Sequence, residues 1–341
     1  MILDGFASPA IDTCAAALQA GELVAFPTET VYGLGADAGN DAAVAKIFAA
    51  KGRPSNHPLI VHLDDEQQGA AGVAHFAAEV PAFARKLMGA FWPGPLTLIL
   101  PRRAGTGTAA AGAQDSIGLR CPAHPVAQAL LRACRVVGVM GLAGPSANRF
   151  GRVSPTTADH VQGEFGTQLL ILDGGACSVG IESTIIDCTR GTPVLLRPGA
   201  ITAAQARAAC GEPVWRVDEA AGLRAPAPRA PGTLAAHYAP RAKVRMMDAR
   251  SLQTALDLLG SDLRRGETPL IATYARAVLR SPSEGVLRRR MPDDAAATAQ
   301  QLFAVLREFD DNGVKLIWVE TPPATPEWDG VRDRLQRASA A

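Results

Sequence analysis

Residues 26–36 read Phe-Pro-Thr-Glu-Thr-Val-Tyr-Gly-Leu-Gly-Ala. Phe26 is also the last of four apolar residues, 23–26. The apolar residues are typical of a buried strand. Pro27 has no backbone N–H donor, which predicts that the strand ends there. Hydroxyls, a carboxylate and two glycines after a strand are typical of a loop that binds a ligand. An ordinary polar turn explains the same residues equally well, so this segment alone favours neither interpretation.

The composition is that of a globular chain with a sizeable core: 48% of its residues are hydrophobic and 20% are charged. A length of 341 residues favours about two domains. The net charge of +1 provides no overall attraction to nucleic acid or acidic membranes. The six cysteines lack the spacing of a zinc motif and the N-terminus lacks the features of a signal peptide, so we expect free thiols and a cytoplasmic protein.

Short apolar segments alternate with helical patterns through most of the chain, which predicts an α/β protein. Residues 126–134 are expected to form a helix that leads into a strand over 136–142. Residues 225–232 are rich in proline and alanine, as in a linker. We therefore predict a first α/β domain over 1–211, a linker over 212–243 and a second α/β domain over 244–341.

Polar side chains recur at the ends of the predicted strands in the first 211 residues. Sheet strands deliver their ends to common edges, so these side chains are expected to share one cleft. Four of them are cations and favour an anionic ligand, because arginine in particular makes paired contacts with phosphate and carboxylate groups. These cations are Lys51, Arg53, Arg120 and Arg197.

The polar side chains at the predicted strand ends also have purely structural explanations. Lys51 could complement the end of a helix, Ser146 and Asn148 could form a turn, and His62 could be a core histidine. The chain contains no Gly-x-Ser-x-Gly, His-Glu-x-x-His or Walker motif. Catalysis, if present, would thus depend on positioning and charge stabilisation and not on a nucleophile or a built-in metal.

Several motifs in this order closely resemble the YrdC family of L-threonylcarbamoyladenylate synthases. The motifs are Pro27-Thr-Glu-Thr-Val-Tyr-Gly-Leu-Gly35, Lys51-Gly-Arg-Pro54, Pro58-Leu-Ile-Val-His62, Trp92-Pro-Gly-Pro-Leu-Thr97, Gly144-Pro-Ser-Ala-Asn148, Ser154-Pro-Thr156, Ser183-Thr184 and Leu196-Arg-Pro-Gly199. The resemblance implies a twisted, open α/β sheet of mixed strand direction with a basic concave cleft. The remaining residues resemble the long form of the enzyme, which adds a smaller Rossmann-like domain. The resemblance therefore implies that residues 1–211 are the catalytic domain and that the linker 212–243 covers the active site.

The resemblance also implies a nucleotidyltransferase reaction in the modification of tRNA. L-Threonine, bicarbonate and ATP give threonylcarbamoyl-AMP and pyrophosphate, and partner proteins pass the threonylcarbamoyl group to adenosine 37 of tRNA. Mg²⁺ is expected to arrive on the ATP phosphates, so no metal-binding residues are predicted. An alternative is a double-stranded RNA or tRNA-binding module without catalysis. Hydrogenase-maturation enzymes share this chemistry, but they carry acylphosphatase and zinc-finger segments that this chain lacks.

Matching motif positions assign the site residues. Lys51 and Arg53 are the expected catalytic cations. The expected contacts to L-threonine and bicarbonate are Thr30, Tyr32, His62, Arg120, Gly144 and Ser183. The expected contacts to ATP are Arg53, His57, Ser116, Ser146, Asn148, Ser154, Arg197 and Tyr238. His57 departs from the family's usual asparagine, and Glu29 is expected to shape its loop and not to act as an acid or base.

Overall fold

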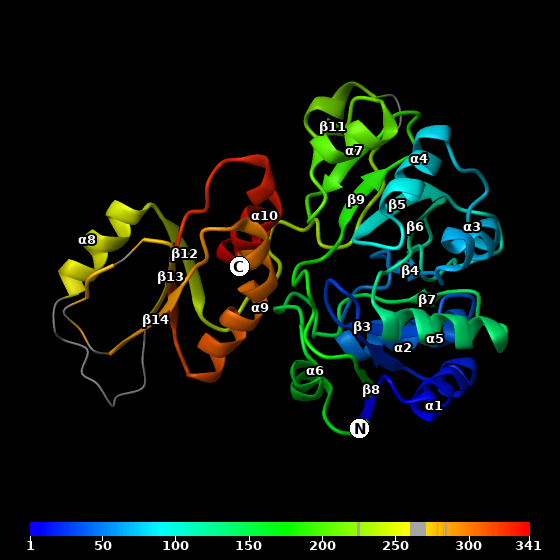
Figure 1. Ribbon diagram of the computed structural model, residues 1–341, viewed down its shortest axis with the longest axis horizontal. Helices are drawn as coiled ribbons and strands as arrows, with labels where there is room; N and C mark the ends of the chain where they lie inside the picture. The colour runs from blue at the N-terminus through cyan, green and yellow to red at the C-terminus, as the bar shows by residue number, and fades with distance from the viewer. Residues whose placement is uncertain (224–225, 260–270, 278, 282, 284) are drawn as a thin grey trace. The chain divides into compact units, whose positions relative to one another are not determined.

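The computed structural model describes residues 1–223, 226–259, 271–277, 279–281, 283 and 285–341 (Figure 1). The chain forms two compact units. The first unit contains Met1–Phe150 and Ser154–Thr233, and the second contains Gly151–Val153 and Leu234–Ala341. The change from one unit to the other thus falls within the predicted linker 212–243, of which residues 224 and 225 lie outside the described part of the chain.

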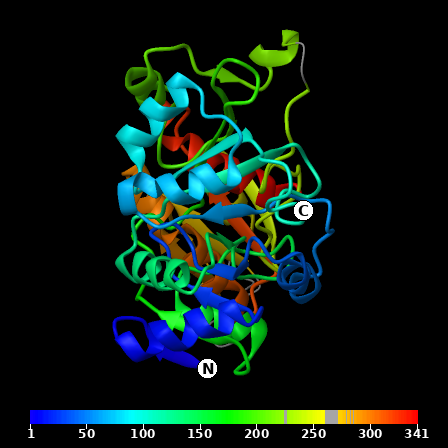
Figure 2. The same ribbon diagram turned by 90° about the vertical axis from the view of Figure 1, so that its right-hand side faces the viewer.

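The first unit is built on a mixed sheet that has eleven strands among the described residues, in the order β1-β8-β2-β3-β7-β4-β6-β5-β9-β10-β11. Parallel pairs such as β4 with β6 alternate with antiparallel pairs such as β5 with β6, which confirms the predicted mixed sheet. The N-terminal strand β1 pairs with β8, as the blue and green segments near the N-terminus show in Figure 2. The strands are β1 (Ile2–Asp4), β2 (Val24–Phe26), β3 (Gly33–Asp37), β4 (Ile60–His62), β5 (Leu96–Pro101), β6 (Ser116–Arg120), β7 (Leu142–Ala143), β8 (Leu170–Asp173), β9 (Thr184–Asp187), β10 (Val194–Arg197) and β11 (Trp215–Arg216).

Helices cover both faces of this sheet. Because side chains alternate along a strand, Val24 and Phe26 of β2 pack in one core with α1 and α5, whereas Ala25 packs in the larger core on the opposite face. Figure 1 shows α1 and α5 side by side. The helices are α1 (Ser8–Gln19), α2 (Asp41–Lys51), α3 (Ala70–Phe76), α4 (Ala82–Phe91), α5 (Pro125–Val136), α6 (Ala158–Phe165) and α7 (Ala203–Cys210), with 3₁₀ turns η1 (Glu66–Gly69) and η2 (Glu219–Gly222).

The sequence determines both ends of α2. The Asn40 side chain accepts a hydrogen bond of 3.1 Å from the Ala43 backbone N–H, as a helix N-cap does. Gly52 ends the helix in the left-handed conformation, with φ of 64°. Lys51 is therefore the last helical residue and lies directly before a sharp change of chain direction.

The predicted strand over 136–142 is wrong. Helix α5 continues to Val136, and β7 contains only Leu142 and Ala143. Between them Gly138 adopts a positive φ of 89°, which a continuous strand does not permit. Val139 and Leu142 still pack in the core, whereas Val136 is exposed, so hydrophobicity alone misled the prediction.

The second unit is a parallel four-stranded sheet in the described part of the chain, with the order β12-β15-β13-β14. This confirms the predicted small, parallel α/β domain, although Leu270, where a strand was expected to begin, lies outside the described residues. Its elements are β12 (Lys243–Met247), α8 (Ala249–Leu259), β13 (Ile271–Ala275), β14 (Val286–Arg290), α9 (Ala295–Asp311), β15 (Leu316–Glu320), η3 (Pro326–Trp328) and α10 (Asp329–Ser339). Across the described residues, no helix combines the length and hydropathy that a membrane span requires.

Candidate active site

Two loops that are distant in sequence lie side by side at the start of β3. The backbone N–H of Leu34 donates to the carbonyl of Pro145 at 2.8 Å, and that of Ala147 donates to the carbonyl of Tyr32 at 2.8 Å. The backbone N–H of Tyr32 donates to the carbonyl of Pro155 at 2.9 Å. The loop over 27–32 is thus held against the residues that follow β7.

The guanidinium of Arg120, at the end of β6, joins this loop through three contacts. Its Nη2 lies 2.7 Å from Glu29 Oε1, its Nη1 donates to Thr30 Oγ1 at 2.8 Å, and its Nε donates to the Gly94 carbonyl at 3.3 Å. The side chains of Arg120 and Glu29 are only 4% and 8% exposed. The arginine therefore carries a buried carboxylate as its direct counter-charge.

The Thr30 hydroxyl continues this network. Thr28 Oγ1 donates to the Val31 carbonyl at 2.6 Å, and the hydroxyls of Thr28 and Thr30 are 2.8 Å apart. Because Thr28 has one hydroxyl proton and the Val31 carbonyl can only accept it, Thr30 is the donor in the contact between the two hydroxyls. Arg120 in turn can only donate to Thr30, which gives the whole network one direction.

His62, the last residue of β4, is buried beside Gly144. Burial, and then the charge of Arg120, lower the pKa of His62 from 6.5 to about 3, so its ring is neutral at physiological pH. Its Nδ1 has no hydrogen-bond partner among the residues that the structure describes. A Cβ at Gly144 would lie 2.9 Å from this nitrogen, so only glycine permits the close approach.

Lys51 projects from the end of α2 to the residues that follow β7. Its Nζ donates to the carbonyl of Ser146 at 2.6 Å and also to the carbonyl of Asn148. Lys51 is 3% exposed, and burial, followed by the charge of Arg53, lowers its pKa well below the usual value. The lysine is thus a buried amine whose direct acceptors are neutral carbonyls.

Arg53 and Arg197 are likewise buried and contact carbonyl oxygens. Arg53 Nη2 donates to Pro58 at 3.0 Å, and the guanidinium lies 5.5 Å from the centre of the Phe150 ring. Arg197 donates to the Ser183 carbonyl at 2.8 and 3.0 Å and to the Pro231 carbonyl at 3.0 Å. Arg197 thereby connects the end of β10 both to the start of β9 and to residues of the predicted linker.

The hydroxyls of two predicted residues have buried partners. Ser183 Oγ is 2.7 Å from Thr97 Oγ1, and Ser154 Oγ donates to Glu182 Oε1. Glu182 is 7% exposed. A buried carboxylate and a buried threonine therefore support the two serines, and sequence reasoning missed both. A glutamate directly before Ser183-Thr184 was the available signal.

The side chains of three further predicted residues, Tyr32, Ser116 and His57, have other surroundings. The Tyr32 hydroxyl donates to the Gly175 carbonyl at 2.8 Å and lies 3.1 Å from Asp173, so it anchors the residues after β8. Ser116 is the first residue of β6, at the opposite end of that strand from Arg120. His57 is half-buried, and its ring meets that of Phe150 edge-on at 5.5 Å.

Tyr238 belongs to the second unit. It is 1% exposed and has a positive φ of 60°, which is uncommon for a residue other than glycine. Its ring lies 5.6 Å from that of Phe303 on α9 and 5.4 Å from the Arg334 guanidinium on α10. The linker residue is thus firmly held by the helices of its own unit.

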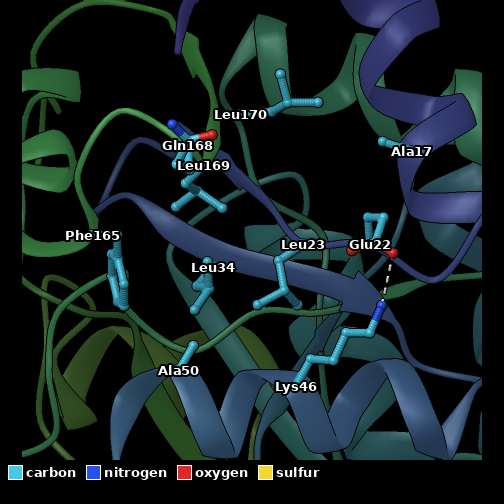
Figure 3. Close-up of a pocket in the computed structure, with 10 residues that line it drawn as sticks. All are labelled: Ala17, Glu22, Leu23, Leu34, Lys46, Ala50, Phe165, Gln168, Leu169 and Leu170. Atoms are coloured by element: carbon cyan, nitrogen blue, oxygen red, sulfur yellow. Dashed lines mark hydrogen bonds and ion pairs between the residues drawn. The ribbon is translucent and has the colours of Figure 1, made fainter.

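The described residues contain no group of three histidine, cysteine, aspartate or glutamate side chains arranged to hold a metal. A separate pocket of about 460 Å³ in the first unit has mostly apolar walls, among them Leu34, Phe165 and Leu169 (Figure 3). Its charged groups are Glu22 and Lys46, which form an ion pair of 2.8 Å. None of the predicted site residues lines this pocket.

Comparison with known families accounts for both units. The family described as "Telomere recombination", Sua5_yciO_yrdC, matches residues 16–199. The family described as "Threonylcarbamoyl-AMP synthase, C-terminal domain" matches residues 201–340. The two matches together extend over nearly the whole chain.

Two curated relatives and a solved structure match this chain over nearly its whole length. A threonylcarbamoyl-AMP synthase of Bacillus subtilis is 39% identical over 97% of this chain and 93% of its own length. One from Pyrococcus abyssi is 37% identical over 94% of this chain and 92% of its own. The crystal structure of Pyrococcus abyssi Sua5 complexed with L-threonine superimposes with a TM-score of 0.86 at 34% identity, covering 99% of this chain and 97% of that one.

Proposed function

Because this chain belongs to the Sua5/YrdC family of threonylcarbamoyl-AMP synthases, we propose that it makes threonylcarbamoyl-AMP at the buried residues around Lys51. The substrates are L-threonine, bicarbonate and ATP, and pyrophosphate is released. The reaction is the first step in forming N6-threonylcarbamoyladenosine at position 37 of tRNA. Partner proteins then transfer the threonylcarbamoyl group, and the reaction takes place in the cytoplasm, where the six buried free thiols are stable.

The observation that best supports this assignment is the environment of Lys51. The amino group of threonine combines with bicarbonate to give an N-carboxylate and water. A carboxylate oxygen then attacks the α-phosphorus of ATP, the bond to the β-phosphate oxygen breaks, and pyrophosphate leaves. Both reactants are anions, so they favour the protonated form of Lys51, and this cation together with Arg53 lowers the repulsion between them. Mg²⁺ on the ATP phosphates would neutralise part of the developing charge.

The proposed threonine side of the site lies around Arg120. Thr30 and His62 contact the amino acid, the Gly144 backbone permits its close approach, and Tyr32 forms a wall. Ser183 completes this side through its hydroxyl. The directed network from Arg120 through Thr30 supports this role, because it leaves the Thr30 oxygen able to accept from a hydroxyl such as that of threonine.

The proposed nucleotide side lies around Arg53 and Arg197. Arg53, Ser146, Asn148, Ser154 and Arg197 contact ATP. His57, Ser116 and Tyr238 are further proposed contacts. The contact between Arg197 and the Pro231 carbonyl supports a linker that reaches the nucleotide side, with residues 212–243 as the cover and residues 244–341 setting its reach.

Pyrophosphate release tests the proposal. The wild-type chain should release pyrophosphate from ATP only when threonine and bicarbonate are both present. Lys51→Met should abolish this release, because it removes the cation and keeps an unbranched side chain. Lys46→Met, on the exposed face of the same helix, is the matched control and should retain full activity. Release that does not depend on threonine, or normal turnover by Lys51→Met, would contradict the proposal.

A catalytically inert RNA-binding module is not favoured. The relatives that cover the whole chain are named as synthases, and the net charge of +1 provides little general attraction for RNA.

A further inference from the structure

Residues Gly151–Val153 belong to the second unit, although their covalent neighbours on both sides belong to the first. Two proposed ATP contacts enclose this short segment in the sequence: Asn148 precedes it and Ser154 follows it at once. The contacts that hold residues 151–153 therefore also restrict the positions of the flanking residues Asn148 and Ser154. Neither the proposed chemistry nor the family matches assign a purpose to this arrangement.

The segment is held first by the backbone of the linker. The Ala239 N–H donates to the Gly151 carbonyl at 2.9 Å, and Arg152 pairs with Ala239 in a parallel β-bridge. Ala239 directly follows Tyr238, the buried linker residue proposed to contact ATP. The segment that directly precedes Ser154 is thus hydrogen-bonded to the linker residue that follows Tyr238, inside the second unit.

Helix α9 holds both of these segments. Arg307 Nη2 donates to the Val153 carbonyl. Asp310 Oδ2 lies 3.5 Å from Arg152 Nη2, and the same carboxylate accepts from the Arg241 N–H at 2.7 Å. One turn of α9 therefore holds the Val153 carbonyl through Arg307, and through Asp310 it holds both Arg152 and the Arg241 backbone, two residues beyond Ala239.

The remaining contacts make this arrangement rigid. The Tyr238 ring lies against Phe303, which is one turn before Arg307 on α9. The His237 N–H donates to the Arg337 carbonyl of α10 at 3.2 Å, and Arg337 donates to Asp333 at 2.8 Å. The linker residues 237–239 are consequently fixed on the second unit before any ligand is considered.

We infer that Arg307 and Asp310 are positioning residues for ATP: they hold residues 151–153 and thereby set the geometry of the adjacent nucleotide contact Ser154. The inference rests on the proposed function and adds a purpose for the second unit. Arg307 acts on the carbonyl of Val153, the residue directly before Ser154. Its loss leaves that end of the segment free to shift, and small displacements of positioning groups have large effects on binding and rate.

Steady-state kinetics of the full-length chain test the inference. Arg307→Met removes the hydrogen bond to Val153 and keeps most of the side-chain volume. We expect the KM for ATP to rise about tenfold, the size of effect associated with one charged hydrogen bond, while the KM for L-threonine stays unchanged. Arg307→Lys, which keeps a donor, should recover most of the loss. Asp310→Asn should raise the KM for ATP as well and serves if Arg307→Met does not fold.

Glu308→Gln is the matched control. Glu308 is next to Arg307 on α9, but its partner is Arg289 of β14, with an Nε to Oε2 distance of 2.9 Å. This substitution removes an ion pair of the second unit without touching residues 151–153 and should leave the KM for ATP unchanged.

Two outcomes would overturn the inference. One is an unchanged KM for ATP in both Arg307→Met and Asp310→Asn, with only the melting temperature lowered, which would make the two residues purely structural. The other is an equal rise in the Glu308→Gln control. If the wild-type chain itself shows no threonine-dependent release of pyrophosphate, the proposed function fails instead, so the two failures are distinguishable.

Discussion

Replacing Glu29 with glutamine should destabilise the first unit strongly, because it removes the counter-charge of a buried arginine. The side chains of Glu29 and Arg120 are 8% and 4% exposed, and their charged atoms lie 2.7 Å apart. Breaking a buried ion pair from one side costs about 3–5 kcal/mol, since the remaining charge stays in a poorly solvated place. This is a large share of the roughly 5–15 kcal/mol that stabilises a typical domain.

The double variant Glu29→Gln/Arg120→Met separates this effect from a simple loss of contacts. With both charges gone, no unpaired ion remains in the interior, and the stability should be higher than that of Glu29→Gln alone. The loss of unfolding free energy in the double variant should therefore be smaller than the sum of the losses in Glu29→Gln and Arg120→Met measured singly, as is usual for residues in direct contact.

The chain has two compact units, so the measurement has to distinguish them. Hydrogen–deuterium exchange of peptides from β4 and β6, followed over a urea series, reports the unfolding free energy of the first unit. The control is Glu22→Gln, which breaks the exposed ion pair with Lys46 and should cost less than about 1 kcal/mol. The reasoning is refuted if Glu29→Gln costs no more than this control, or if the losses in the double variant simply add.

Two further predictions concern the residues next to this pair. The pKa of His62 is lowered to about 3, so between pH 6.5 and 3 the unfolded chain binds a proton that the folded chain does not, and stability falls as the pH falls. Lowering the pH from 6.5 to 4.5 should therefore cost the wild type about 2–3 kcal/mol more than His62→Gln, measured by the same exchange series; an equal loss in both would contradict this. Gly144→Ala would place a Cβ 2.9 Å from His62 Nδ1 and 3.1 Å from Phe26 Cζ, so it should reduce threonine-dependent pyrophosphate release sharply. Gly163→Ala, whose Cβ would meet nothing within 4 Å, is the control, and equal activities would show that the close approach is unnecessary.

Local sequence signals predicted the end of β2 correctly. Pro27 was expected to end a strand, and β2 ends at Phe26. The expectation that strand ends meet is consistent with the contact between Arg120 and Thr30, which are 90 residues apart. The end of the strand follows from the missing N–H of proline, which acts on its immediate neighbours. The meeting of strand ends follows from a geometry that is common to all sheets.

Features that depend on the pairing of particular distant residues could not be predicted. Glu29 was expected only to shape its loop, and nothing near it in the sequence identifies Arg120 as its partner. The assignment of residues 151–153 to the second unit is a stronger example. It depends on Arg307 and Asp310, more than 150 residues further along the chain, and on a bridge to Ala239.

The partners of the buried cations suggest how the site divides its two substrates. Arg120 has a carboxylate beside it, so the pair is neutral as a whole. The direct acceptors of Lys51 are carbonyl oxygens, and the charge of Arg53 lowers its pKa further. A neutral pair suits threonine, which carries one positive and one negative charge. The charges of Glu164 and Glu182 favour protonated Lys51 but do not offset its burial, so the free energy of burying its charge is recovered further when a carboxylate or phosphate binds. We therefore expect anionic ligands to raise the pKa of Lys51, and its protonated form to be most stable in the complex with both substrates.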